Sequence, residues 1–297
     1  MLNFDFYSPE EEIHFPLYET RHVRVFVKRD DLIHPFISGN KWRKLKYPLH
    51  QAREQHKTLL VTFGGAWSNH LLATACAGAK FGFRTYGFVR GEDVENPVLA
   101  MCRLYGMKLH FVDRTTYRDK QNLVNTYFSD DPSAFFIDEG GYSALGARGC
   151  AEIVHELRRP YDYCFCAGGT GTTLAGLALG IQERNLSTQL HGVPVLKGAD
   201  FLAKEIAHLS ENSLPPTLHL NYHFGGYAKT KPALIAFIQA FVRHTGILIE
   251  PTYSGKLFFA VHDLIEQGKI PSGSNILLIH TGGLTGVLGT LHQFNKP

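Results

Sequence analysis

The sequence lacks the features that mark nucleic-acid-binding, exported or membrane-spanning proteins. Its 297 residues include 30 Lys and Arg against 27 Asp and Glu, and a net charge of +3 excludes a polybasic nucleic-acid binder. No apolar run approaches the roughly 20 residues of a membrane helix, and residues 1–12 are acidic and aromatic, unlike a signal peptide. We therefore expect a cytoplasmic protein without nucleic-acid or membrane partners.

Cysteine is also scarce. The five cysteines are odd in number and unpatterned, which favours reduced thiols over disulfides. Cys164 and Cys166 fall on one face of an expected strand, as buried structural cysteines do. Although there are 16 His, neither a His-Glu-x-x-His motif nor a Cys/His ligand spacing occurs, so we predict no catalytic metal.

What the sequence does contain is an alternation of β-rich runs with helical stretches. Strands are expected at residues 58–63, 84–89, 108–112, 134–137, 162–167, 189–195, 246–248 and 275–280, and helical patterns include 69–81, 97–105 and 147–157. The alternation predicts βαβ units and parallel sheets. Eight or nine strands exceed what one open sheet needs, so we predict two doubly wound α/β domains with a ligand in the cleft between them. Residues 1–46 and 151–297 would form the larger domain, and residues 47–150 the smaller.

Four cations, Lys41, Arg43, Lys44 and Lys46, follow Ser38-Gly39-Asn40 at the expected start of a helix. Lys41 and Lys44 share one helix face. Cations at a helix N-terminus oppose the helix dipole, so a bound anion would compensate for them. The alternative is a solvated basic helix face.

A second motif, Gly64-Gly65-Ala66-Trp67-Ser68-Asn69-His70, joins an expected strand to an Ala-rich helix. Amide N–H groups at this helix start would bind an anionic group such as a carboxylate. The alternative is that Ser68 serves only as the helix N-cap.

The third motif is Gly168-Gly169-Thr170-Gly171-Thr172-Thr173, between a strand and a helix. Glycines admit a ligand close to the backbone, and the helix dipole favours negative charge, so we predict a phosphate cradle. No Gly-Lys-Ser/Thr follows, and Leu174 stands where a dinucleotide fingerprint has its third Gly. The motif therefore predicts a single phosphate on a small cofactor, with a simple tight turn as the alternative.

Three further features lie toward the C-terminus. They are the motifs at residues 250–256 and 280–283, and Tyr227, which follows Gly225-Gly226. A tyrosine alone is more typical of a half-buried core residue. Combined with a lysine after Gly-Asn and a phosphate cradle, however, these motifs point to pyridoxal 5'-phosphate. The lysine would form the Schiff base and the cradle would hold the phosphate.

These motifs make the sequence similar, over residues 28–289, to the fold-type-II pyridoxal-phosphate enzymes of the 1-aminocyclopropane-1-carboxylate deaminase/D-cysteine desulfhydrase family. The resemblance implies an amino-acid substrate and a homodimer. It assigns the Schiff base to Lys41 and the phosphate to Lys44 with Gly168, Gly169, Thr170, Gly171 and Thr172. It places Ser68 and Asn69 beside the substrate carboxylate and the cofactor's ring hydroxyl, with Trp67 and His70 flanking them. Tyr227 and Tyr253 match the two active-site tyrosines, Ser254 the position facing the pyridine nitrogen, and Thr281 a nearby position.

Three residues depart from the family pattern: Trp67 for the usual Gln, Leu72 for a frequent Arg and Tyr142 for a small polar residue. Trp67 and Leu72 are expected to border the substrate pocket. Ser254 and Thr281 follow the desulfhydrase members, because the deaminase has Glu and Leu there. A hydroxyl stabilises a pyridinium less than a carboxylate does, and the weaker electron sink suffices when a good leaving group departs.

The sequence therefore favours β-elimination from D-cysteine or a related D-amino acid, giving pyruvate, ammonia and sulfide. Cyclopropane deamination to 2-oxobutyrate and ammonia is the alternative enzyme reaction. A third alternative is a pyridoxal-phosphate-binding protein with little turnover.

Overall fold

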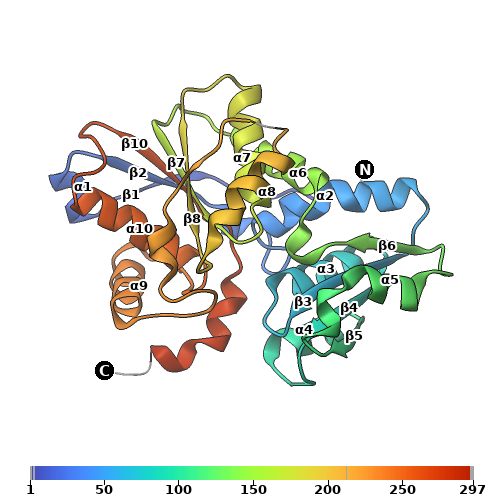
Figure 1. Ribbon diagram of the computed structural model, residues 1–297. Helices are drawn as coiled ribbons and strands as arrows, with labels where there is room; N and C mark the ends of the chain where they lie inside the picture. Colours follow the sequence, from blue (N-terminus) through green and yellow to red (C-terminus); the bar gives the residue numbers. More distant parts are fainter. Residues whose placement is uncertain (1, 3, 212, 295–297) are drawn as a thin grey trace.

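A computed structural model describes residues 2, 4–211 and 213–294, and within them the strands form two sheets (Figure 1). The larger sheet has the order β1-β2-β10-β7-β8-β9 and is parallel except for β1, which pairs antiparallel with β2. Its strands are β1 (Glu10–Ile13), β2 (Arg24–Lys28), β7 (Tyr163–Gly168), β8 (Gln189–Pro194), β9 (Thr217–Leu218) and β10 (Asn275–Ile279).

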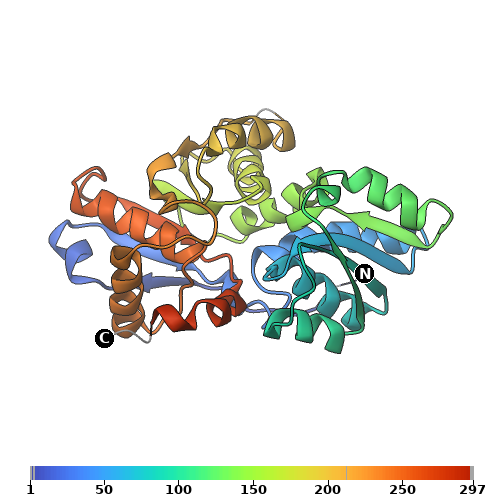
Figure 2. The same ribbon diagram turned by 60° about the horizontal axis from the view of Figure 1, so that its bottom comes forward.

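The smaller sheet is parallel throughout and has the order β5-β4-β3-β6. Its strands are β3 (Leu59–Gly65), β4 (Arg84–Arg90), β5 (Met107–Val112) and β6 (Ala134–Ile137). Figure 2 shows this sheet and its helices beside the body built on the larger sheet. Two sheets made mainly of parallel strands, each with its own helices, are the α/β architecture that the sequence predicts.

Helices cover both sheets. The α-helices are α1 (Pro16–Thr20), α2 (Asn40–Glu54), α3 (Asn69–Phe81), α4 (Pro97–Leu104), α5 (Lys120–Phe128), α6 (Ala144–His155), α7 (Thr172–Glu183), α8 (Leu202–Leu209), α9 (Pro232–Thr245) and α10 (Ser254–Glu266). Short 3₁₀ helices are η1 (Asp30–Leu32), η2 (Thr116–Arg118), η3 (Glu139–Gly141), η4 (Ala199–Phe201), η5 (Leu220–His223), η6 (Leu284–Gly289) and η7 (Leu291–Gln293). Several begin at polar caps: Ser68 Oγ accepts the Leu71 N–H at 3.2 Å, and Ser143 Oγ accepts the Gly146 N–H at 2.9 Å.

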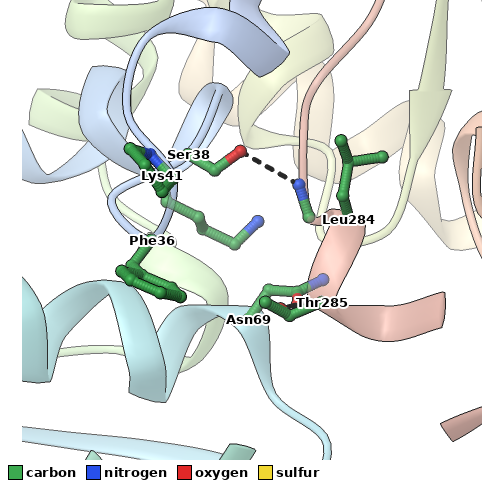
Figure 3. A pocket seen from close by; sticks show the side chains of 8 residues that line it. Phe36, Ser38, Lys41, Asn69, Leu284 and Thr285 are labelled. Atoms are coloured by element: carbon green, nitrogen blue, oxygen red, sulfur yellow. Dashed lines mark hydrogen bonds between the residues drawn. The ribbon is translucent and has the colours of Figure 1, made fainter. Parts of the chain in front are cut away.

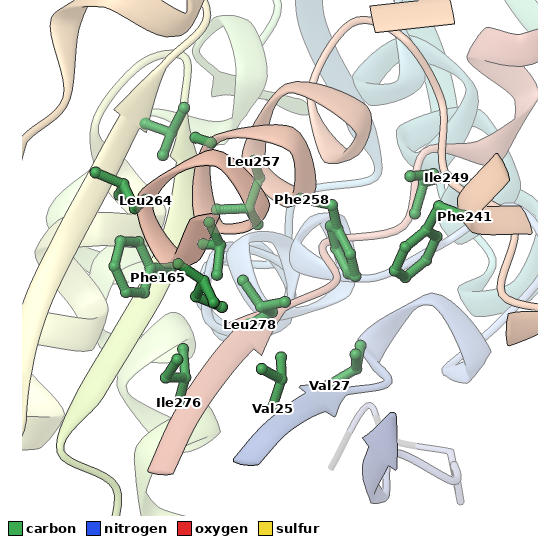
Figure 4. Close-up of a cluster of buried hydrophobic side chains, with 14 of the residues drawn as sticks. Val25, Val27, Phe165, Phe241, Ile249, Leu257, Phe258, Leu264, Ile276 and Leu278 are labelled. Carbon is green, nitrogen blue, oxygen red and sulfur yellow. The ribbon is translucent and has the colours of Figure 1, made fainter. Parts of the chain in front are cut away.

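The larger sheet is buried on both faces, which explains why its strands read as nearly continuous apolar runs. Alternate residues point to opposite sides: Val25, Val27, Ile276 and Leu278 pack with α9 and α10 (Figure 4). Phe26, Leu277 and Ile279 pack on the other side, against α6 and α7. Each fully buried large apolar side chain contributes roughly 1.5–3 kcal/mol. Two-sided burial therefore fixes the strand register.

The expected strands and helices are largely confirmed, with three corrections. Residues 246–248 join no sheet, and Gly246, with φ +70°, ends α9 in the left-handed conformation, so the strand expected there is wrong. The pattern missed β1, β2 and β9, which are short or bounded by charged residues such as Arg24 and Lys28. The third helical stretch begins at Ala144, not 147, because Ser143 caps it.

Helices α2 and α6 each cross one of the expected domain boundaries, and they pack against each other. A Cβ built on Gly149 of α6 would lie 1.9 Å from the carbonyl oxygen of Arg43 in α2, so only glycine permits this approach. The division at residues 46/47 and 150/151 stays a proposal.

Candidate active site

Lys41 stands at the second position of α2, where that helix begins against the loop after β10. The Asn40 N–H donates to the Thr281 carbonyl at 3.2 Å. Gly39 has φ +56°, and a Cβ there would lie 2.0 Å from the same oxygen. Lys41 Nζ donates to Asn40 Oδ1 at 2.8 Å, and Asn40 Nδ2 donates to Thr173 Oγ1 of α7 at 3.0 Å. The lysine is thereby tied to the start of α7.

The environment of Lys41 favours a neutral amine. Burial, together with the positive charge of Lys44, lowers the pKa of Lys41 to about 7. Burial also lowers the pKa of Lys44, whose Nζ donates to the Gly140 carbonyl at 3.3 Å. Within the described residues neither lysine forms an ion pair, whereas buried Arg43 pairs with Asp30 and Glu156. A buried lysine, Lys44, and a partly buried one, Lys41, both without anionic partners among the described residues, leave room for an anionic ligand.

This burial overturns the alternative of a solvated basic helix. Trp42, Arg43, Lys44 and Leu45 are all buried, and they turn the first turn of α2 toward the protein interior. The cation cluster therefore divides into two ion-paired residues, Arg43 and Lys46, and the two lysines Lys41 and Lys44 at the candidate site.

The Gly/Thr motif lies between β7 and α7, as expected. Gly171, with φ +85°, occupies the N-cap position of α7, and the hydroxyls of Thr170 and Thr172 lie 3.1 Å apart. A Cβ built on Gly169 would lie 3.1 Å from Cε1 of Tyr253. The loop thus presents helix N-terminal N–H groups, threonine hydroxyls and a close backbone, which suit a phosphate.

Tyr253 and Tyr227 form an aromatic wall beside this loop. Their ring centroids are 5.9 Å apart with an interplanar angle of 75°. Burial raises the pKa of both phenols, so both hydroxyls carry their proton at neutral pH. They can therefore donate a hydrogen bond or a proton.

Ser254 is buried at the start of α10, but Glu250 rather than Ser254 caps that helix. The Glu250 carboxylate accepts the N–H groups of Thr252, Tyr253 and Ser254 at 2.6–2.8 Å. Ser254 Oγ accepts the Glu250 N–H at 2.8 Å and lies 3.4 Å from Glu250 Oε1. Sequence reasoning missed Glu250, although an acidic residue just before a helix was the available signal.

Ser68 and Asn69 lie at the start of α3, on the side of the smaller sheet. Asn69 Oδ1 accepts the Thr285 hydroxyl at 2.9 Å, which joins α3 to η6. A small cavity here is lined by Pro35, Phe36, Ser38, Lys41, Asn69, Gly283, Leu284 and Thr285. Figure 3 shows the Lys41 side chain extending into the space between Ser38 and Asn69. The structure therefore brings Lys41, Asn69 and the loop after β10 together.

The other residues singled out in the sequence lie in different surroundings; they are Trp67, His70, Leu72 and Tyr142. Trp67 is 42% exposed, and its ring lies 3.1 Å from a Cβ built on Gly289 of η6. The buried His70 contacts Thr62 Oγ1 of β3 at 2.9 Å, and burial holds its pKa well below the usual value. Leu72 packs in the hydrophobic cluster between α3 and α4, so it does not line the small cavity. The Tyr142 hydroxyl donates to Glu205.

Pyridoxal phosphate fits these residues. The phosphate would be held by the loop from Gly168 to Thr172 and by the uncompensated charge of Lys44, and the neutral amine of Lys41 suits covalent attachment of an aldehyde. An amine that loses its proton near neutral pH, linked through Asn40 to a loop that suits a single phosphate, is the arrangement that a pyridoxal-phosphate enzyme of fold type II requires.

Comparison with known proteins identifies the family. Residues 13–282 match the model described as "Pyridoxal-phosphate dependent enzyme", and the chain belongs to that family. A bifunctional D-cysteine desulfhydrase/1-aminocyclopropane-1-carboxylate deaminase of Arabidopsis thaliana is 29% identical, over 91% of this chain and 75% of the relative. A D-cysteine desulfhydrase of Serratia proteamaculans is 30% identical, over 87% of this chain and 86% of the relative. The crystal structure of an ACC deaminase homologue superposes with a TM-score of 0.84, at 28% identity, over 97% of this chain and 92% of the other.

These findings make the protein a pyridoxal-phosphate-dependent lyase or deaminase. The five cysteines are buried and form no disulfide. None of the helices in the described ranges combines the length and hydropathy needed to span a bilayer. Over the same ranges, His, Cys, Asp and Glu side chains nowhere gather in threes suited to a metal ion.

Proposed function

We propose that this enzyme catalyses β-elimination from D-cysteine or a related D-amino acid, giving pyruvate, ammonia and sulfide. One observation carries the choice of reaction: the start of α10 presents the Ser254 hydroxyl, not a carboxylate. Glu250 does not replace that carboxylate, because three backbone N–H groups engage its two oxygens. A neutral partner for the cofactor's ring nitrogen gives a weaker electron sink, which is sufficient for a reaction in which a thiolate leaves readily.

Each side chain has a proposed part in the reaction. When bound, pyridoxal phosphate supplies a conjugated ring that withdraws electrons from the substrate Cα. Lys41 Nζ, with its pKa about 7, removes the Cα proton. The N–H groups at the start of α3, beside Ser68 and Asn69, bind the substrate carboxylate. The protonated hydroxyls of Tyr227 and Tyr253 donate hydrogen bonds to the leaving thiolate.

Cyclopropane deamination is the second candidate, because one relative is named for both activities. Opening a cyclopropane ring requires a stronger electron sink, since carbon is a poor leaving group. Ser254 and Thr281 therefore favour the elimination.

We also infer a homodimer, from the family resemblance, and a reducing compartment such as the cytoplasm. Five buried thiols without a disulfide support the compartment.

The purified, cofactor-loaded protein is to be assayed with D-cysteine, L-cysteine, D-serine and 1-aminocyclopropane-1-carboxylate, following sulfide, pyruvate and 2-oxobutyrate. Sulfide and pyruvate from D-cysteine in equal amounts are expected. Lys41→Ala should remove the visible absorbance of the bound cofactor and lower kcat by about 10²- to 10⁴-fold. Lys46→Ala, further along the same helix, is the control. 2-Oxobutyrate as the main product would replace the proposal with deamination, and no product from any substrate would reject both.

A further inference from the structure

A second cavity, of about 590 Å³, lies at the carboxyl edge of the smaller sheet. It is lined by Ala66, Arg90, Gly91, Glu92, Val94, Asp113, Arg114 and Thr115, which end or follow β3, β4 and β5. Open parallel sheets bind ligands at this edge. Ala66 belongs to the loop that continues into Ser68, so the cavity adjoins the part of the site proposed to hold the substrate.

Two guanidinium groups in this cavity have no acidic partner among the residues that the structure describes. Over the described ranges, neither Arg90 nor Arg114 forms an ion pair, although Glu92 and Asp113 share the cavity wall. The Asp113 carboxylate is engaged instead, because its Oδ1 accepts the N–H groups of Thr115 and Thr116 at 2.9 and 3.1 Å. The arginines therefore keep their donors for a ligand.

Arg90 is held in a defined place. Its guanidinium carbon lies 5.5 Å from the ring centroid of the buried Tyr117, and its Nη2 lies 3.6 Å from a Cβ built on Gly65. Stacking on an aromatic ring orients the planar fork of an arginine at a small entropic cost. Such a fork binds phosphate or sulfonate oxygens with two parallel hydrogen bonds.

Arg90 also adjoins the loop proposed to bind the substrate, because its Nη2 lies 3.6 Å from a Cβ built on Gly65, three residues before Ser68. Burial raises the pKa of Tyr227, and the charge of Arg90 acts on the same phenol in the opposite direction. Tyr227 contacts Tyr253, which stands over the Gly169 loop.

We propose that Arg90, assisted by Arg114, binds an anionic group on the β-substituent of the substrate. The enzyme would then prefer amino acids whose leaving group carries a phosphate or sulfonate. This inference rests on the proposed β-elimination. With O-phosphoserine, the Cα proton is removed, the Cβ–O bond breaks with its electron pair on phosphate, and one water yields pyruvate, ammonia and phosphate. No oxidant or reductant takes part.

The test compares O-phospho-D-serine, which has an anionic leaving group, with O-acetyl-D-serine, which has a neutral ester, by pyruvate release. Arg90→Ala should raise KM for the phosphate ester at least about tenfold, because it removes a charge-assisted hydrogen bond, and leave KM for the acetate ester within about twofold. Arg90→Lys should restore part of the loss. Arg118→Ala, an exposed arginine on η2 outside the cavity lining, is the matched control.

Calorimetric titration of the cofactor-loaded protein with O-phospho-D-serine, D-serine and inorganic phosphate measures binding apart from turnover. It therefore distinguishes failure of the anion subsite from failure of the proposed elimination. Arg90-dependent binding of O-phospho-D-serine without pyruvate from any substrate would support the anion subsite and reject the elimination. Equal effects of Arg90→Ala on both esters, with elimination intact, would overturn the subsite alone. Binding of inorganic phosphate at Arg90 without discrimination between the esters would also overturn it, since the cavity would then serve a free anion.

Discussion

The side-chain amide of Asn40 hydrogen-bonds to Thr173, with Nδ2 donating to Oγ1 at 3.0 Å. The other end of the same amide accepts Lys41 Nζ at 2.8 Å. One residue therefore fixes the amine of α2 relative to the first turn of α7. The amine proposed to attach the cofactor and the loop proposed to hold its phosphate are thereby kept at a set separation, which a flexible lysine side chain alone would not ensure.

The pKa of Lys41 should control how fast the apoprotein takes up pyridoxal phosphate. The neutral amine attacks the aldehyde, so the rate should rise with pH and reach half its maximum near pH 7. Lys44→Met removes a like charge, so the pKa of Lys41 should rise and the midpoint should move to higher pH. Stopped-flow absorbance measures the rate of cofactor uptake at a series of pH values, from about 5.5 to about 9.5, in buffers of constant ionic strength. A midpoint that stays in place would contradict the coupling of the two lysines.

A methyl group at residue 169 should weaken cofactor binding. In Gly169→Ala the added carbon would lie 3.1 Å from the Tyr253 ring, so the loop or the ring must shift. We expect a loss of about tenfold in pyridoxal-phosphate affinity, equivalent to about 1.4 kcal/mol, by equilibrium titration. Gly286→Ala is the control, because its nearest atom would be 3.5 Å away. Equal affinity in both variants would show that the loop does not hold the phosphate.

The partner of the cofactor's ring nitrogen should decide between the two candidate reactions. Ser254→Glu should lower elimination of D-cysteine and raise cyclopropane turnover, most of all with Thr281→Leu. Glu250 Oε1 lies only 3.4 Å from Ser254 Oγ, and a second carboxylate there would be raised in pKa by repulsion. Glu250→Gln therefore belongs in the series, as does Trp67→Gln to widen the pocket.

The absorbance of the bound cofactor, recorded against pH, supplies a second readout for this series. Ser254→Asn with full D-cysteine activity, together with Ser254→Glu that changes neither substrate preference nor absorbance, would remove the ring-nitrogen role from Ser254.

The close packing of α2 on α6 should make Gly149 important for stability. Gly149→Ala would bring a methyl group against the Arg43 carbonyl, at 1.9 Å without movement. Overpacking of this kind costs about 1–3 kcal/mol in the free energy of unfolding, measurable by denaturant titration. Arg148→Ala, the exposed neighbour, should cost less than about 1 kcal/mol.

Sequence patterns predicted the fold well where periodicity and turn chemistry agree. The helix 69–81 was predicted to the residue, because Ser68 caps its start and Gly82, with φ +72°, ends it. The strands β1, β2 and β9 were not predicted, because runs of two to five residues carry little periodic signal.

The site was predicted in part. Lys41 and the Gly/Thr loop have local sequence signatures, and the structure brings their helices together through Asn40. No role for Glu250 or Arg90 was predicted, because their significance comes from contacts in the folded protein. The Glu250 carboxylate accepts backbone N–H groups at the start of α10, and the Arg90 guanidinium stacks on the Tyr117 ring. Such relationships depend on tertiary geometry that one sequence does not display.

The position of β10 has a consequence for the order in which the protein is completed on the ribosome. This strand is among the last segments to be synthesised, yet it pairs with both β2 and β7 near the centre of the larger sheet. Until residues 275–279 emerge, β2 and β7 have no common neighbour and expose strand edges that invite association with other chains. The smaller sheet, encoded between β2 and β7, can pair fully before then. A nascent chain would therefore carry one finished sheet and one open sheet, and a stop codon before residue 275 would leave a protein prone to aggregation.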